Sequence, residues 1–115
     1  GPYSDESVDY PEYAEKVCDN VLKDKNSLGI LICGTGIGMS ISANKIKGIR
    51  AALCNDIFTS KLSRQHNDSN VLVLGSRVIG FGVATEIVKN FINCDFEGGR
   101  HASRLELIKR IEQKN

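Results

Sequence analysis

Tryptophan is absent from the 115-residue chain, and only two prolines and 6% aromatic residues are present. No run of apolar residues approaches the roughly 18 that a membrane-spanning helix needs. The first residues carry neither the basic nor the apolar region of a secretory signal peptide. We therefore expect a soluble protein of the cytoplasm.

The chain also lacks an excess of charge of one sign, because 15 Lys and Arg residues face 14 Asp and Glu residues, for a net charge of +1. Such a balance gives no general attraction to nucleic acid or to an anionic membrane. Hydrophobic residues (41%) and charged residues (25%) have the frequencies of ordinary globular domains. The length predicts one domain over residues 1–115, and any anion-binding site in it must be local.

The four cysteines lack the close spacing of metal ligands, since there is no C-x-x-C pair and no nearby His at ligand spacing. We therefore expect no metal site. Cys18, Cys54 and Cys94 lie in apolar stretches, which predicts buried thiols that behave as small hydrophobic residues. Cys33 is different because glycines follow it.

Helix-like and strand-like hydrophobic patterns alternate along the chain. Apolar residues at three- and four-residue spacing predict helices over residues 10–24, 39–46, 56–66, 82–92 and 100–113. Continuous apolar runs predict strands over residues 28–32, 49–54 and 71–74. Residues 1–8 have no periodicity and predict a loop. Asp9 and Asp56 can cap the helices that follow them.

Strands that alternate with helices in this way predict an α/β fold with a parallel sheet and right-handed crossovers. The run over residues 28–32 predicts a strand buried on both faces. If its edge is open, it offers unpaired N–H and C=O groups to a partner, so we expect something else to cover it. In the last helix we expect Leu105, Ile108 and Ile111 to face the core.

The strongest local signal is the segment ICGTGIG at residues 32–38, where a predicted strand leads through three glycines into a helix. Glycines let backbone N–H groups point into one concavity, and the helix N-terminus adds a positive dipole, so the loop suits an anion. The same dipoles favour a thiolate at Cys33, which makes it a candidate base or nucleophile. A buried Cys that ends a strand before a tight turn is the alternative. The glycine spacing matches neither a dinucleotide fingerprint nor a Walker A loop.

Two further segments carry candidate residues at helix ends. His66 and Asn67 follow a predicted helix and precede a strand, where a loop can present an imidazole to a cleft. A solvated His at a helix end is the alternative. Arg100 and Arg104 follow two glycines and lie four residues apart, so both can contact one phosphate. A basic surface turn is the alternative, although cations at a helix N-terminus are unfavourable unless an anion is present.

Several segments, in the same order, resemble one known family. They are residues 7–11 (SVDYP), 30–38 (ILICGTGIG), 63–68 (SRQHND), 70–77 (NVLVLGSR) and 97–101 (EGGRH). Over its whole length the chain resembles the B-type ribose-5-phosphate isomerases and the related galactose-6-phosphate isomerase subunits. The resemblance implies a Rossmann-like parallel sheet sandwiched by helices, with three strands here and five in the family. It also implies a homodimer or higher homo-oligomer whose sites lie between subunits.

The chemistry implied by the resemblance is the isomerisation of ribose 5-phosphate to ribulose 5-phosphate through a cis-enediolate, without a cofactor. Cys33 would move the C2 proton, His66 would protonate the ring oxygen, and Thr35 would position the reacting carbons. The backbone N–H groups of residues 34–38 would stabilise the enediolate. The substrate-binding residues that the resemblance implies are Gly34, Thr35, Gly36, Ile37, Gly38, Asn67, Arg77, Arg100 and Arg104, with His101 as a weaker candidate.

One departure from the family matters for activity. Family members begin earlier, with a strand that ends in an Asp-His pair, a helix and a second strand, so the chain resembles an N-terminally truncated member. A non-catalytic isomerase-like chain is therefore one alternative. A phosphotransferase-system B module with phosphocysteine at Cys33 is another, but it leaves His66 and residues 98–101 without a role. The choice among ribose, allose and galactose phosphates stays open.

Overall fold

The computed structural model describes residues 10–114, and within them three strands alternate with five helices. In chain order the elements are α1 (Tyr10–Lys23), β1 (Gly29–Cys33), α2 (Ile37–Asn44), β2 (Ala51–Leu53), α3 (Ile57–Gln65), β3 (Val71–Gly75), α4 (Phe81–Asn93) and α5 (Arg100–Gln113). Every predicted helix and strand is present, although β2 is shorter than the predicted run. The predicted loop at residues 1–8 and the cap at Asp9 lie outside the described residues.

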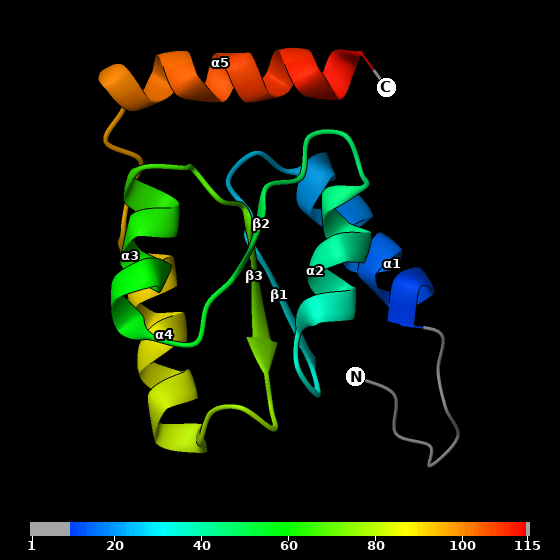
Figure 1. The fold of residues 1–115 in the computed structure, drawn as a ribbon, viewed down its shortest axis with the longest axis vertical. Helices are drawn as coiled ribbons and strands as arrows, with labels where there is room; N and C mark the ends of the chain where they lie inside the picture. The colour runs from blue at the N-terminus through cyan, green and yellow to red at the C-terminus, as the bar shows by residue number, and fades with distance from the viewer. Residues whose placement is uncertain (1–9, 115) are drawn as a thin grey trace.

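The three strands form one parallel sheet in the order β1-β3-β2. Helices α1 and α2 cover one face, and α3 and α4 cover the other (Figure 1). Each face has its own core, with Leu31 and Val73 packed among α1 and α2 and with Leu72 and Leu74 packed against α4. The prediction of a Rossmann-like parallel sheet sandwiched by helices is confirmed.

The central strand and the edge strand differ in burial. All five residues of β3 are buried, because β3 has a strand on each side and helices on both faces. By contrast, β1 lies at an edge, and Ile32 in it is 55% exposed. The prediction that the first strand is buried on both faces is therefore wrong. A continuous apolar run does not distinguish a central strand from an edge strand.

Helix α3 begins where its sequence predicts. The side chain of Asp56 accepts a hydrogen bond from the backbone N–H of Thr59 at 2.7 Å, which satisfies one of the free donors at the helix N-terminus. At the end of α2, the Asn44 side chain both donates to and accepts from the backbone of Ala51. The Asn44 contacts connect the end of α2 to the start of β2.

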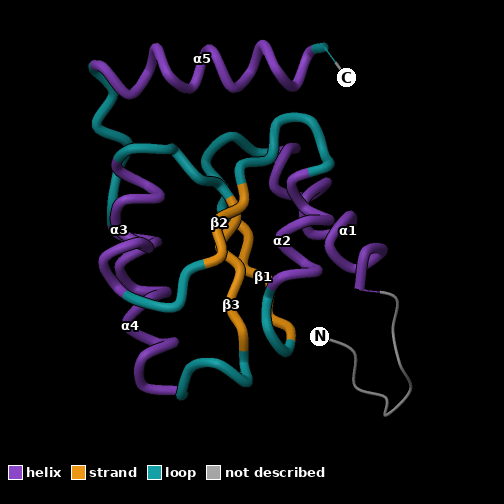
Figure 2. Tube along the Cα trace, viewed as in Figure 1, coloured by secondary structure: helices purple, strands orange, loops and turns teal. Residues whose placement is uncertain are grey.

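Helix α5 departs from its predicted packing. It runs crosswise beyond the end of the sheet where the strands begin, rather than along a sheet face (Figures 1 and 2). Ile108 and Ile111 are 49% and 61% exposed, and Leu105 is half-buried, so the prediction that all three face the core is wrong. His101 is the one buried residue of this helix. None of the helices within residues 10–114 combines the length and the apolar character needed to cross a membrane.

The edge of β1 generates a prediction about association. Among residues 10–114, no strand pairs with the outer side of β1. The N–H of Gly29 donates inward to the carbonyl of Asn70 at 2.9 Å, so the alternation of a strand turns the N–H groups of Ile30 and Ile32 outward. We expect the 115-residue chain to self-associate through this edge, because exposed ladder groups of an apolar strand pair with another chain.

Light scattering over a concentration series measures this association. Ile32→Pro removes one outward donor without touching the inner ladder, and we expect it to lower the average mass. Substitution of Val83, an exposed apolar residue on α4, by Lys is the matched control and should leave the mass unchanged. A wild-type chain that stays monomeric at every concentration contradicts the prediction.

Candidate active site

The carboxyl ends of β1 and β3 bring the glycine loop beside the loop that follows β3. Cys33 pairs with Gly75 in register, and the carbonyl of Cys33 accepts from the N–H of Ser76 at 2.8 Å. The N–H of Arg77 donates to the carbonyl of Gly34 at 2.9 Å. A Cβ added to Gly34 would lie 3.5 Å from Cδ of Arg77, so the arginine side chain lies against the loop. The structure thus brings Cys33, residues 34–38 and Arg77 together.

Gly36 is required by the geometry of this loop. Its φ of 83° is left-handed, and it forms the N-cap of α2. A Cβ at this position would lie 2.4 Å from Cδ1 of Leu53 and 3.2 Å from the backbone of Leu74. Both the backbone conformation and the close approach of β2 and β3 therefore exclude any larger residue.

Two amides of the predicted anion cradle already hold side chains of the loop. The N–H of Gly36 donates to Sγ of Cys33 at 3.2 Å, and the N–H of Ile37 donates to Oγ1 of Thr35 at 3.2 Å. The first contact orients the sulfur toward the helix N-terminus, where a negative charge is favoured. The second fixes the Thr35 hydroxyl at the mouth of the loop.

The four cysteines fall into two groups by exposure. Cys18 and Cys54 are buried as predicted. Burial raises the pKa of Cys18 to about 11, with the Asp19 charge as a smaller cause, and burial also raises the pKa of Cys54. Cys33 and Cys94 are both partly exposed. The prediction of a buried thiol at Cys94 is therefore wrong. Helix α4 ends at Asn93, and Cys94 follows it in extended backbone, outside the helix.

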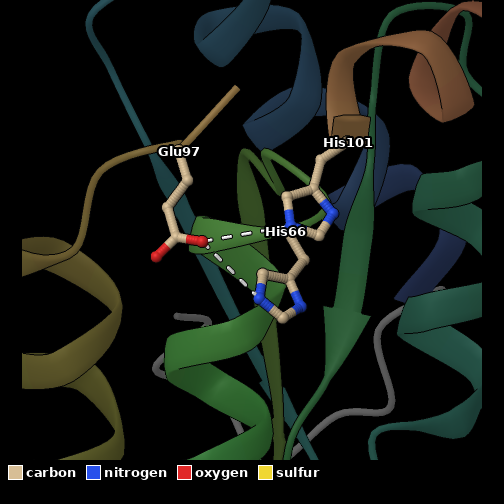
Figure 3. A group of neighbouring side chains, drawn as sticks. All are labelled: His66, Glu97 and His101. Carbon is tan, nitrogen blue, oxygen red and sulfur yellow. Dashed lines mark ion pairs between the residues drawn. The ribbon is translucent and has the colours of Figure 1, made fainter. Parts of the chain in front are cut away.

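The second cluster contains His66, Glu97 and His101, which come from three segments (Figure 3). The two imidazole rings stack with centroids 4.1 Å apart and planes 14° apart. Nε2 of His66 lies 3.7 Å from Oε1 of Glu97, and Nε2 of His101 lies 3.9 Å from the same oxygen. The N–H of Glu97 donates to the carbonyl of Gln65 at 2.9 Å, which ties this loop to the end of α3.

His101 is buried within this cluster, whereas the predicted phosphate ligands Arg100 and Arg104 are exposed beside it on α5. Burial lowers the pKa of His101 below its ordinary value, and the charges of His66 and Arg100 act in the same direction. Glu97 acts in the opposite direction. Both arginines occupy the first turn or so of α5, where a bound anion would relieve their repulsion from the helix dipole.

An ion-pair network that sequence reasoning missed fixes the turn after His66. Asp68 has a left-handed φ of 47°, which is uncommon outside glycine. Its carboxylate oxygens lie 3.4 Å from Nη2 of Arg50 and 3.3 Å from Nη1 of Arg64, and its carbonyl accepts from Nε of Arg50 at 2.7 Å. The two arginines hold the strained turn from two sides. The backbone at His66 and Asn67 is set by these contacts.

Asn67 reaches a cleft on the α5 side of the sheet. The cleft has a volume of about 660 Å³ and lies among α5, the end of α2 and the start of β2. Its lining includes Asn67, Arg50 and Ser69 together with Leu105 and Ile108 of α5. The exposed side chain of Asn67 is therefore available to a ligand from this side.

The two clusters lie at opposite ends of the sheet. Cys33 ends β1 and neighbours the end of β3. His66 precedes the start of β3 and stacks on His101 of α5, the helix that lies beyond that end of the sheet in Figure 1. The five residues of β3 alone span about 16 Å at the rise of a β-strand. One small ligand cannot contact both clusters within one chain. A site that uses both must combine two chains.

The donor atoms of His66, Glu97 and His101 lie within 4.8 Å of one another, which is close enough for three ligands of one metal ion. A metal ion lies in the plane of each imidazole that binds it. The two rings here are stacked nearly parallel, so their Nε2 lone pairs do not converge on one point. The arrangement suits a shared proton better than an ion. Glu97 was not among the predicted site residues, and the one signal along the chain is its four-residue spacing from His101.

The fold and these two clusters define a class: a parallel α/β protein with a cysteine-glycine loop at the carboxyl ends of its strands and a cluster of two histidines and a glutamate at the opposite end of the sheet. The model of the Ribose/Galactose Isomerase family matches residues 1–108. The chain belongs to this family of sugar isomerases.

Individual relatives agree with this assignment. The chain is 51% identical over 114 residues to ribose-5-phosphate isomerase B of Escherichia coli, which covers 99% of this chain and 76% of that protein. A solved ribose-5-phosphate isomerase B of Clostridium thermocellum matches with a TM-score of 0.95 and 48% identity, over 99% of this chain and 77% of that one. The enzyme of Mycoplasma genitalium, solved with bound ribulose-5-phosphate, matches with a TM-score of 0.93 and 45% identity, over 100% and 77%. The chain thus spans about three quarters of the length of these relatives.

Cys33 is expected to be the most reactive thiol, because it is accessible and its sulfur accepts an amide hydrogen bond at a helix N-terminus. Brief alkylation with iodoacetamide at neutral pH, followed by peptide mapping, should label Cys33 first. Cys94 should follow, and Cys18 and Cys54 should react only on unfolding. Labelling of Cys94 before Cys33 would count against the assignment.

Proposed function

We propose that this chain is a sugar-phosphate isomerase that interconverts ribose 5-phosphate and ribulose 5-phosphate in the cytoplasm, without a cofactor. The observation that carries the proposal is the likeness to ribose-5-phosphate isomerase B, including the relative solved with ribulose-5-phosphate. The accessible Cys33 on its glycine loop supplies the base that such a reaction requires. Residues 1–115 act as a single isomerase domain.

The proton transfer is assigned to Cys33. Its thiolate removes the proton from C2 of the open-chain sugar, and the electron pair moves to form the cis-enediolate. Return of the proton to C1, together with movement of the hydroxyl proton from O2 to O1, completes the ketose, so Cys33 ends as the thiolate with which it began. The N–H groups within residues 34–38, other than those of Gly36 and Ile37 that bond Cys33 and Thr35, stabilise the enediolate oxygen, a contribution of about 3 kcal/mol per donor in comparable sites. The Thr35 hydroxyl positions the reacting carbons.

Ring opening and phosphate binding are assigned to the second cluster. His66 donates a proton to the ring oxygen, and Asn67 binds the sugar hydroxyl groups. Arg100 and Arg104 bind the phosphate, because guanidinium groups match phosphate oxygens in geometry and charge. Arg77 is a further contact from the loop after β3, next to Gly34.

A homodimer or higher homo-oligomer follows from this assignment. Cys33 and His66 lie at opposite ends of the sheet, so their joint action on one sugar phosphate requires the glycine loop of one copy and the histidine cluster of another. The exposed apolar side chains of α5 suit such a contact between copies.

Turnover tests the proposed reaction directly. Incubation with ribose 5-phosphate should produce ribulose 5-phosphate, measured by its ketose absorbance or by NMR. Cys33→Ala should abolish exchange of the C2 proton with solvent, because no other group is assigned to that step. Cys94→Ala, which alters the other partly exposed thiol, is the control and should retain activity. Absence of ketose from the assembled oligomer, or phosphate transfer to Cys33, would sink the proposal.

The arginines should act on affinity rather than chemistry. Arg100→Ala or Arg104→Ala removes a charge-assisted contact of about 1.5 to 3 kcal/mol, so Kd for the sugar phosphate should rise roughly ten- to a hundredfold. Binding of unphosphorylated ribose should hardly change. Arg110→Ala, near the other end of α5, is the matched control. Equal losses for both ligands would make the two arginines structural.

A further inference from the structure

The only two histidines of the chain stack on each other and share one carboxylate oxygen. Figure 3 shows Oε1 of Glu97 facing the Nε2 edge of both rings. Glu97 itself has no part in the proposed chemistry. Its backbone N–H nevertheless donates to the carbonyl of Gln65. Its side chain contacts two histidines, one just after the end of α3 and one at the start of α5.

The charges around the pair favour one proton and oppose a second. Glu97 is the anion that faces the rings. The cations that face His101 are Arg100 and Arg104 from its own helix and, when protonated, His66 from the end of α3. Two imidazolium rings with centroids 4.1 Å apart repel each other. The pair therefore gains its protons in two separated steps.

The two rings differ in exposure. The side chain of His101 is 10% exposed, whereas that of His66 is 36% exposed. A charged ring loses less hydration at the more exposed position, so the geometry favours a shared proton on the outer ring of the pair. The lowered pKa of His101, of which burial is the first cause, points the same way.

We propose that Glu97 is a positioning residue that holds Nε2 of His66 and keeps one proton on the stacked pair, leaving Nδ1 of His66 free to act as the acid. Use of that proton rests on the proposed function, but its retention does not. In ring opening, Nδ1–H passes its proton to the ring oxygen as the bond from that oxygen to the anomeric carbon breaks. The anomeric hydroxyl loses its own proton to water and becomes the aldehyde. His66 is left neutral, with Nε2–H toward Glu97.

NMR titration of the imidazole signals tests retention of the proton without any need for turnover, because the chain has only these two histidines. In the wild-type chain the stacked pair should titrate in two separated steps. Glu97→Gln should move the first step down by about 0.5 to 1 pH unit, since the carboxylate that favours the imidazolium is gone. Glu97→Asp keeps the charge but shortens the side chain, and should fall between the two.

Glu86→Gln is the matched control. Glu86 is 52% exposed against 53% for Glu97, and its carboxylate pairs with Lys89 on α4, away from the histidines. It should titrate as the wild type. If Glu97→Gln does not fold, the comparison of Glu97→Asp with the wild type decides the question. Titration curves that coincide for the Glu97 variants and the wild type would overturn the proposal.

A second readout addresses use of the proton. In the assembled enzyme, Glu97→Gln should move the alkaline fall of kcat to lower pH by the same 0.5 to 1 unit, with KM changed less than about twofold. An unchanged kcat profile beside a shifted NMR titration would remove the catalytic role of the proton and leave its retention intact. Absence of all turnover from the wild type would strike the proposed function alone.

Discussion

The parallel pairing of β3 with a strand on each side is the constraint on which the rest of the structure depends. A strand with both edges paired and both faces apolar must be covered on both faces, which is why two helices pack on each side of the sheet. Parallel strands also require helical crossovers. The chain therefore returns to the same end of the sheet before each strand. This places every strand-to-helix loop at one end of the sheet and every helix-to-strand loop at the other end.

This separation divides the chemistry of the protein between two ends. Arg77 lies against Gly34, the residue after Cys33, because β1 and β3 end side by side, and the helix N-terminus after the loop favours negative charge there. His66 and His101 stack because α3 ends close to the start of α5, which runs crosswise beyond that end of the sheet. A parallel crossover cannot place both sets of groups at one end of the sheet, and this constraint is the reason why the proposed site combines two copies.

Left-handed backbone conformations occur beside the candidate site residues at both ends of the sheet. Gly36 and Asp68 both have left-handed φ values, and each lies within three residues of a proposed catalytic side chain. At Gly36 the strain is relieved by the absence of a Cβ, and the resulting close approach lets the loop contact β3. At Asp68 the strain is held by Arg50 and Arg64. A missing Cβ at Gly36 and two ion pairs at Asp68 thus give the two turns a defined shape. Such fixed turns hold the backbone donors and the imidazole of the proposed site in place.

Local interactions explain what the sequence by itself determined. The helices and strands, the Asp56 cap and the glycine loop after Cys33 all depend on residues within a few positions of one another, so spacing alone predicts them. The family resemblance added the roles proposed for His66, Arg100 and Arg104. Tertiary structure decided the strand order, the exposure of Ile32 at an edge, and the crosswise course of α5 that leaves Ile108 and Ile111 exposed. It also decided that Glu97 meets both histidines and that Asp68 meets two arginines, because such contacts join segments whose distance in space is set by packing and not by their distance along the chain.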